Sequence, residues 1–243
     1  MKRWYEYKDA FLDLIFPSDI YCICCSQPIY NQPYSICKDC MAKIKWVTLP
    51  ACIQCGKPLS LNYLTHKCHD CIDTKHSFKQ GFSCMVYDDR AKEMIYGLKF
   101  NEKAYYAKFF AQLIFEKIKN ENLVFDYIIP VPLHKKREKE RGYNQAKLIA
   151  EHLSALTQIP ALFNVLIRTR YTLPQNQLSL RERNNNLKNA FQVTRPSVLL
   201  DKQILLIDDV YTTGSTVDTC SKELLINKAS EVYVATCAIG EDF

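Results

Sequence analysis

Cysteines arranged in regular pairs are the first feature of this sequence that could do chemistry. Four Cys-x-x-Cys pairs follow one another, with eleven residues between the first and second pairs and twelve between the third and fourth. Two intervening residues let both sulfurs of a pair reach one ion from a tight turn, and two such pairs supply the four thiolates of a zinc ribbon. The candidate zinc ligands are therefore Cys22, Cys25, Cys37, Cys40, Cys52, Cys55, Cys68 and Cys71.

The pairing of these cysteines leaves alternatives open. Sequence order favours one zinc ion in each consecutive quartet, but crossed pairing and a single filled site fit the same spacing. Cys24 and Cys84 lie outside the pairs and are interpreted as small buried residues. Four thiolates leave no open position on the ion for water or substrate, so the zinc is expected to be structural.

A second chemical signal is a pair of acids followed by a hydroxyl-rich turn. The apolar run at 204–207 predicts a buried strand, and Asp208 and Asp209 follow where it would leave the sheet. Two neighbouring carboxylates need a cation or donors between them, which ribose hydroxyls and Mg²⁺ would supply. The turn opens into a helix, so its amides, hydroxyls and the helix dipole converge on an anion. The predicted phosphate loop consists of Thr212, Thr213, Gly214, Ser215 and Thr216.

Gly214 supports the interpretation of this loop as a phosphate site, because the chain has only six glycines and the backbone can approach an anion where no Cβ intrudes. The alternative is an ordinary strand followed by a capped helix. A basic run at 134–147 holds six Lys or Arg against two Glu. By itself such a run is usually an exposed helix face, but directly after a strand it fits an anion site equally well.

These residues need a scaffold of alternating strands and helices. Strands are predicted at 82–87, 127–131, 203–207 and 231–238, and helices at 89–98, 104–118, 144–156 and 215–227. This alternation predicts a doubly wound, mostly parallel α/β sheet. An apolar stripe ahead of the cysteines predicts a short helix that packs in a core or, as the alternative, binds a partner. The stripe consists of Trp4, Tyr7, Phe11, Leu14 and Ile15.

Length and composition set the number of units. The 243 residues suffice for one α/β domain and a small satellite, and 48% of them are apolar, which argues against extended disorder. Ten of the twelve cysteines lie between Cys22 and Cys84, which predicts a module at 1–80 and a domain at 81–243. The net charge of +6 would fall with zinc-bound thiolates, so charge alone is weak support for nucleic-acid binding. Without a membrane-spanning stretch or a signal sequence, the protein is expected to be cytoplasmic.

The segment around the paired acids resembles the phosphoribosyl-diphosphate fingerprint of type I phosphoribosyltransferases, and the whole chain resembles the ComF family of competence proteins. The likeness covers nearly the full length. It also rests on the segments at 98–100 (Leu-Lys-Phe), 131–134 (Val-Pro-Leu-His), 141–146 (Arg-Gly-Tyr-Asn-Gln-Ala), 177–179 (Gln-Leu-Ser) and 181–187. The resemblance implies a type I phosphoribosyltransferase-like sheet preceded by a cysteine-rich, zinc-ribbon-like module.

The resemblance also implies roles for individual residues. Asp208 and Asp209 would hold the ribose 2′ and 3′ hydroxyls and stabilise positive charge on the sugar in any transfer reaction. The phosphate loop would bind the 5′-phosphate of phosphoribosyl diphosphate, which would arrive with Mg²⁺. The further residues expected at this ligand are Val131, Pro132, Lys135, Arg181 and Arg183.

Two functions follow from the resemblance and the site chemistry. In the first, the protein is a DNA-uptake factor whose zinc module docks a helicase-like ATPase and whose larger domain binds phosphoribosyl diphosphate and single-stranded DNA. Fifteen Tyr and twelve Phe are available to stack on bases, although most are expected in the core. In the alternative, it is an active phosphoribosyltransferase that transfers phosphoribose to an unidentified base or amine and releases pyrophosphate.

Overall fold

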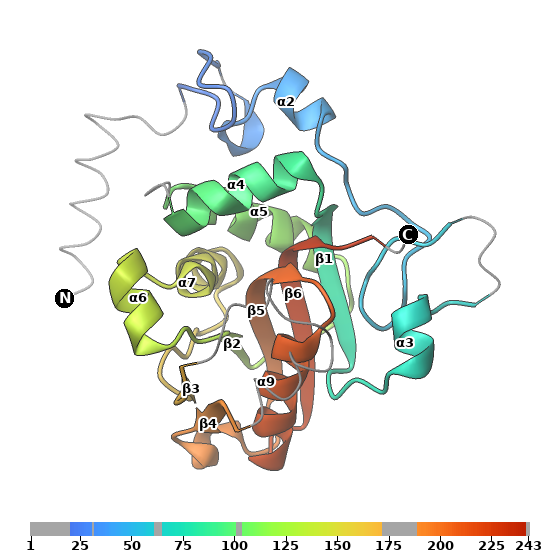
Figure 1. The fold of residues 1–243 in the computed structure, drawn as a ribbon, viewed down its shortest axis with the longest axis vertical. Helices are drawn as coiled ribbons and strands as arrows, with labels where there is room; N and C mark the ends of the chain where they lie inside the picture. Colours follow the sequence, from blue (N-terminus) through green and yellow to red (C-terminus); the bar gives the residue numbers. More distant parts are fainter. Residues whose placement is uncertain (1–19, 31, 61–64, 101–103, 172–188, 242–243) are drawn as a thin grey trace. The chain divides into compact units, whose positions relative to one another are not determined.

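The computed structural model describes residues 20–30, 32–60, 65–100, 104–171 and 189–241 (Figure 1). Contacts divide the chain into two compact units, Met1–Ile44 and Lys45–Phe243. The second cysteine quartet therefore belongs to the larger unit. The boundary expected after residue 80, between a module at 1–80 and a domain at 81–243, stays a prediction. The N-terminal apolar stripe at 4–15 lies outside the described residues.

In the smaller unit, tight turns bring the first cysteine quartet together. Tyr21 and Pro28 form an antiparallel bridge, and the amide of Ser26 donates to the carbonyl of Cys22 at 2.8 Å. A 3-10 turn, η1 (Pro33–Ser35), and a short helix, α2 (Lys38–Ala42), follow. These turns bury Cys22 although the unit has few residues to form a core.

Four parallel strands form the sheet of the larger unit. They are β1 (Gln80–Val86), β2 (Tyr127–Pro130), β5 (Gln203–Tyr211) and β6 (Glu231–Ile239), in the order β1-β6-β5-β2. Ala161 adds a parallel bridge to Ile128 of β2. The strands are buried on both faces, which is why their sequences are continuous apolar runs.

Helices cover both faces of this sheet. On one face α5 (Tyr106–Ile118) packs against α7 (Gln145–Thr157), and α4 (Asp89–Phe100) contacts α5. On the other face α9 (Ser215–Ile226) shares a core cluster with β5 and β6 that contains no described residue of α5 or α7 (Figure 1). The chain crosses the sheet from β1 to β2 and then returns through β5 to β6. Because crossovers are right-handed, the outward and return helices lie on opposite faces.

The structure confirms the α/β class and the doubly wound, mostly parallel sheet, and the largest difference in a strand boundary is at the end of β5. The strand expected at 203–207 continues to Tyr211, because β6 continues to pair with it. Asp208 and Asp209 therefore lie inside β5 and not after it. They still lie beyond Pro130, the last residue of β2 that pairs with β5.

Shorter elements complete the larger unit. The helix α6 (Lys135–Arg141) follows β2, and an antiparallel pair, β3 (Leu166–Arg168) and β4 (Phe191–Val193), lies farther along the chain. The helix α3 (His69–Asp73) carries the last cysteine of the second quartet. A 3-10 turn, η3 (Pro196–Leu199), precedes β5. Within the described ranges, no helix is long and apolar enough to cross a membrane.

Candidate anion-binding cavity and zinc centres

A cavity of about 1140 Å³ opens at the carboxyl ends of β2 and β5. These neighbouring strands continue into crossovers on opposite faces of the sheet, which leaves a crevice between them. Val131 and Pro132 line the cavity after β2, and Asp208 and Asp209 line it from β5. The cavity therefore lies where the ligand of a doubly wound sheet is expected to bind.

The two acids have different surroundings because consecutive residues of a strand point to opposite faces of the sheet. The Nζ atom of Lys99 lies 2.7 Å from Oδ2 of Asp209, and Nε2 of Gln145 donates to the same oxygen at 2.9 Å. The backbone amide of Asp209 donates to Oδ1 of Asp208 at 2.9 Å. Asp209 is thus held by a cation and an amide, whereas Asp208 receives a backbone N–H.

Burial is the main reason that Asp208 differs from a free carboxylate. Burial and the charge of Asp209 raise the pKa of Asp208 to about 7, against the opposing effects of the Asp209 amide, Lys99 and Arg168. Burial lowers the pKa of Lys99, but the charges and hydrogen bond of the two acids outweigh it, so the pKa of Lys99 is raised. Near neutral pH the pair therefore presents an acceptor for a cation or a hydroxyl donor.

We expect an Asp208→Asn substitution to stabilise the protein in a pH-dependent way. Because the folded pKa of about 7 lies above the ordinary aspartate value of 3.8, folding binds a proton in this window, and stability falls as pH rises through it. Asparagine removes this cost. The free energy of unfolding should rise by about 2 to 4 kcal/mol near pH 8 and by much less near pH 4, measured by urea denaturation.

Asp126 provides the control of opposite sign. Its pKa is lowered, because the amide of Gln203 and the Lys202 side chain donate to its carboxylate. Asp126→Asn should therefore destabilise the protein at a pH above the range in which Asp126 titrates. The difference from the parent protein should disappear at low pH, where the parent carboxylate is protonated. Equal stability of Asp208→Asn and the parent protein at alkaline pH would contradict the buried-acid interpretation.

The hydroxyl-rich loop after β5 forms another wall of the site. Gly214 caps α9 with a φ of 76°, and a Cβ there would lie 2.7 Å from Cζ of Tyr211, so glycine is required without a shift of the ring. The hydroxyls of Thr213 and Ser215 lie 3.0 Å apart. The amide of Asp218 donates to the carbonyl of Gly214 at 2.8 Å and closes the first turn of α9. The loop and the first turn of α9 thus form the kind of helix N-terminus at which anions bind.

A basic wall is positioned by the junction between α6 and α7. Arg141 donates to Oε1 of Gln145, the residue that also holds Asp209. The hydroxyl of Tyr143 donates to the carbonyl of Leu98 and ties this junction to α4. Arg137, Arg141 and Arg168 all line the cavity. Several cationic groups therefore face the same space as the two acids.

Most of the residues predicted from the sequence come together here. Those that line the large cavity are Val131, Pro132, Asp208, Asp209, Thr212 and Thr216. Gly214 and Ser215 line a small hollow beside it, and Thr213 lies between these residues in the same loop. Lys135 begins α6, is exposed and does not line the cavity. Arg181 and Arg183 lie outside the described residues.

Sequence reasoning missed several residues of this cavity. Lys99, Gln145 and Arg141 were part of the motifs that carry the family resemblance, and this was the available signal for them. Arg168 and Tyr171 also line the cavity, but no comparable pattern marked them. Their positions depend on the packing of the β3–β4 pair.

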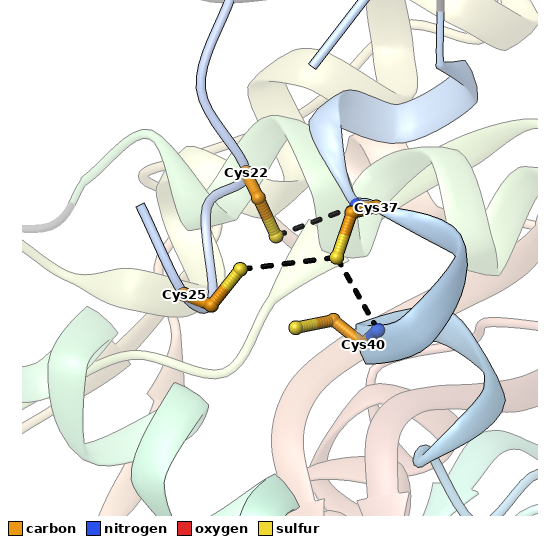
Figure 2. Close-up of side chains that lie close together, drawn as sticks. All are labelled: Cys22, Cys25, Cys37 and Cys40. Atoms are coloured by element: carbon orange, nitrogen blue, oxygen red, sulfur yellow. Dashed lines mark hydrogen bonds between the residues drawn. The ribbon is translucent and has the colours of Figure 1, made fainter. Parts of the chain in front are cut away.

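The first cysteine quartet brings four sulfurs together in the smaller unit (Figure 2). The sulfurs of Cys25 and Cys37 are 3.8 Å apart. The amides of Cys37 and Cys40 donate to the sulfurs of Cys22 and Cys37, each at 3.4 Å. Amides that point at sulfur stabilise thiolates, the form that binds metal.

The second quartet is more deeply buried than the first. Cys52, Cys55, Cys68 and Cys71 are all buried, and their ligand atoms lie within 4.8 Å of one another. All four belong to the core cluster on the α9 face of the sheet. The backbone of Gly81 approaches this site so closely that a Cβ would lie 2.9 Å from the carbonyl oxygen of Cys55. The quartet is thus built into the larger unit.

Both quartets fit zinc. A tetrahedral ion with Zn–S distances of about 2.3 Å requires sulfurs roughly 3.8 Å apart, and the measured separations are 3.8 Å for Cys25–Cys37 and 3.6 Å for Cys55–Cys68. The grouping follows sequence order and is not crossed. These clusters support structural Zn²⁺, which would hold each knuckle closed through four thiolates.

Comparisons with known proteins match the cysteine-rich segment to a zinc ribbon family and most of the chain to competence and DNA utilization proteins. The double zinc ribbon domain family matches residues 11–72. "Competence protein F" of Haemophilus influenzae is 31% identical over 219 residues, covering 88% of this chain and 94% of that protein. "DNA utilization protein YhgH" of Escherichia coli is 30% identical over 218 residues, with the same coverage. "Competence protein ComFC" of Bacillus subtilis is 31% identical over 199 residues, covering 78% of each chain.

Solved structures show a looser likeness. A purine phosphoribosyltransferase from Pyrococcus horikoshii is 22% identical, with a TM-score of 0.35 and coverage of 58% of this chain and 75% of that one. Glutamine phosphoribosylpyrophosphate amidotransferase from Bacillus subtilis is 21% identical, with a TM-score of 0.36 and coverage of 55% and 25%. The assignment of the fold rests on the strand order and crossovers described above, and not on these scores.

Proposed function

Because the chain belongs to the competence protein F and ComFC family, we propose that it acts in the uptake or use of DNA and that its larger unit binds phosphoribosyl diphosphate. The observation that carries the ligand proposal is the joint position of the acid pair and the phosphate loop in one cavity. Acids suited to sugar hydroxyls and amides suited to a phosphate are the two halves of a phosphoribosyl site.

Each part of this ligand has residues suited to it. Asp208 and Asp209 would hold the ribose hydroxyls, and the loop at 212–216 would hold the 5′-phosphate. Val131 and Pro132 would face the pyrophosphate, with Arg137 and the other arginines of the basic wall near it. Mg²⁺ bound with the pyrophosphate would neutralise part of its charge.

Exposed rings beside cationic groups support binding of single-stranded DNA. Tyr96 and Phe100 are 57% and 58% exposed, and their ring centroids lie 4.9 Å apart. Arg141 lies 4.8 Å from the ring of Phe100, and Lys136 lies 4.9 Å from that of Tyr171. Rings that stack on bases next to cations that bind phosphates are the usual elements of a single-strand site.

Exposed apolar side chains on the smaller unit support docking of a helicase-like ATPase. Tyr30 is 87% exposed and Tyr21 is 56% exposed. Such side chains are enriched in the centres of protein interfaces. A structural zinc ribbon would hold them on a rigid surface.

The size of the cavity favours a second candidate, an active phosphoribosyltransferase. Its volume of about 1140 Å³ exceeds the roughly 300–1,000 Å³ of a typical ligand pocket, so an acceptor could bind beside the sugar phosphate. In the reaction, the bond from C1′ to the pyrophosphate oxygen would break and a bond from C1′ to the acceptor would form. The acceptor would release a proton, and Asp208 and Asp209 could stabilise positive charge on the sugar.

Calorimetric titration of the full chain with phosphoribosyl diphosphate and Mg²⁺ tests the proposal. We expect saturable one-site binding that inorganic phosphate competes for; no binding by a folded, zinc-loaded chain would refute it. Binding of a labelled single-stranded oligonucleotide that weakens with salt and survives Asp208→Asn would support the DNA role. Pyrophosphate release that requires an added base or amine would instead support the transferase.

A further inference from the structure

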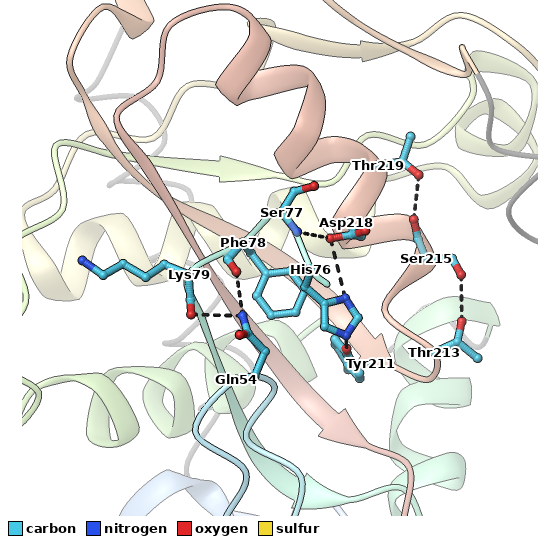
Figure 3. A network of polar contacts seen from close by, with 10 residues as sticks. All are labelled: Gln54, His76, Ser77, Phe78, Lys79, Tyr211, Thr213, Ser215, Asp218 and Thr219. Carbon is cyan, nitrogen blue, oxygen red and sulfur yellow. Dashed lines mark hydrogen bonds and ion pairs between the residues drawn. The ribbon is translucent and has the colours of Figure 1, made fainter. Parts of the chain in front are cut away.

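A buried histidine, His76, follows the second cysteine quartet in the sequence and contacts residues beside the phosphate loop, as Figure 3 shows for the loop side. The side chain of His76 is only 2% exposed. Its Nε2 lies 3.4 Å from the hydroxyl of Tyr211, and its Nδ1 lies 3.6 Å from Oδ1 of Asp218. Its ring stacks on Phe78 with centroids 4.8 Å apart. His76 therefore contacts groups on both β5 and α9.

The segment that carries His76 is fixed by the cysteine quartet. It follows α3, which begins directly after Cys68 and contains Cys71. The side chain of Gln54, between the other two cysteines, donates to the carbonyl of Phe78 at 2.7 Å. Phe78 and the four cysteines belong to one buried cluster. A metal that closed this quartet would therefore also fix the backbone on which His76 lies.

The other side of the network is the phosphate loop. The ring of Tyr211 lies against Gly214, where even a Cβ would clash with it. Asp218 donates its amide to Gly214 and accepts the amide of Ser77 at 2.5 Å through its carboxylate. Figure 3 shows this carboxylate directed to Ser77 and His76 and not to the hydroxyls of Thr213 and Ser215.

This orientation matters for an anion. Asp218 lies in the first turn of α9, where the helix dipole stabilises its negative charge. The same charge would repel a phosphate bound at this end of the helix. The amide of Ser77 gives that charge a hydrogen-bond donor, and the ring of His76 lies beside the carboxylate. Without these partners, the carboxylate could turn toward the amides that the phosphate needs, because acidic side chains readily accept such amides.

We propose that the second quartet, through His76, Tyr211 and Asp218, holds the phosphate loop in its anion-binding shape, so that phosphate affinity depends on this network. The inference rests on the proposed function of the loop as a phosphate site. His76 is then a positioning residue that does not itself contact the ligand.

The test compares His76→Phe with His69→Phe in the full chain. Phenylalanine at 76 keeps the stacked ring but loses both polar contacts, whereas His69 is an exposed histidine on α3 of the same ribbon. Titrations with inorganic phosphate, and with phosphoribosyl diphosphate plus Mg²⁺, should show about tenfold weaker binding for His76→Phe. Zinc content and thermal unfolding should stay close to the parent, and His69→Phe should bind as the parent does.

Two further variants separate positioning from packing. His76→Gln keeps a donor and an acceptor but loses the ring, so we expect it to bind phosphate more tightly than His76→Phe does; a space-filling role predicts the reverse order. Tyr211→Phe removes one hydroxyl and gives the same comparison should His76→Phe fail to fold. Parent-like phosphate affinity in these folded variants overturns the inference alone, whereas a parent chain that binds neither probe overturns the proposed function and this inference with it.

Discussion

A Cys55→Ser substitution is expected to unfold the larger unit, whereas Cys25→Ser is expected to leave it folded. Cys55 is 1% exposed and packs in the core cluster with β5 and β6. Structural zinc contributes roughly 10–16 kcal/mol to the folding of small ribbons, as much as the roughly 5–15 kcal/mol stability of a whole domain. Cys25 is exposed and belongs to the smaller unit.

Zinc content and circular dichroism measure this difference. The parent chain should hold two zinc ions and Cys25→Ser one, with helix signal and cooperative unfolding of Cys25→Ser close to those of the parent. Cys55→Ser should lose the cooperative transition, or show a melting temperature lower by tens of degrees. Similar losses from both variants would contradict the integration of the second quartet into the sheet. Cys24→Ser, at a cysteine outside the Cys-x-x-Cys spacing, controls for the loss of a thiol.

The scaffold could be predicted from the sequence because it depends on local patterns. Buried parallel strands are continuous apolar runs, and the helices between them have apolar stripes, so the alternation identified both. The end of β5 could not be predicted, since its continuation past Ile207 depends on pairing with β6. Spacing identified the two cysteine quartets, but not that the second one packs against the sheet, because spacing does not specify tertiary contacts.

In the candidate site, too, local patterns identified some residues, whereas others depend on tertiary contacts. The acid pair and the phosphate loop are contiguous in the sequence, so one segment revealed them. Lys99 pairs with Asp209 across a large part of the chain, and in isolation it resembles any lysine near the end of a helix. Lys135 illustrates the opposite limit, because a basic run next to a strand favours an anion site but does not specify which of its side chains face the cavity.

The ion pair between Lys99 and Asp209 makes the Asp209 carboxylate important for stability as well as for ligand binding. Asp209→Asn should lower the free energy of unfolding by about 2 to 4 kcal/mol, because it leaves a largely buried ammonium without its counterion. The side chain of Lys99 stays 23% exposed, which places this cost at the lower end of the range for buried pairs. The same variant should bind phosphoribosyl diphosphate about 100-fold more weakly, because an amide is a poorer acceptor for the ribose hydroxyls than a carboxylate.

A Lys99→Met/Asp209→Asn double variant separates the two effects. Removing both charges eliminates the unpaired ammonium, so most of the lost stability should return, as a double-mutant cycle by urea denaturation would measure. Binding of phosphoribosyl diphosphate should stay weak, because the carboxylate is still absent. Glu93→Gln, an exposed acid on the same cavity wall, is the matched control and should bind as the parent does. Restored binding in the double variant would show that Asp209 acts only as the counterion of Lys99 and does not contact the sugar.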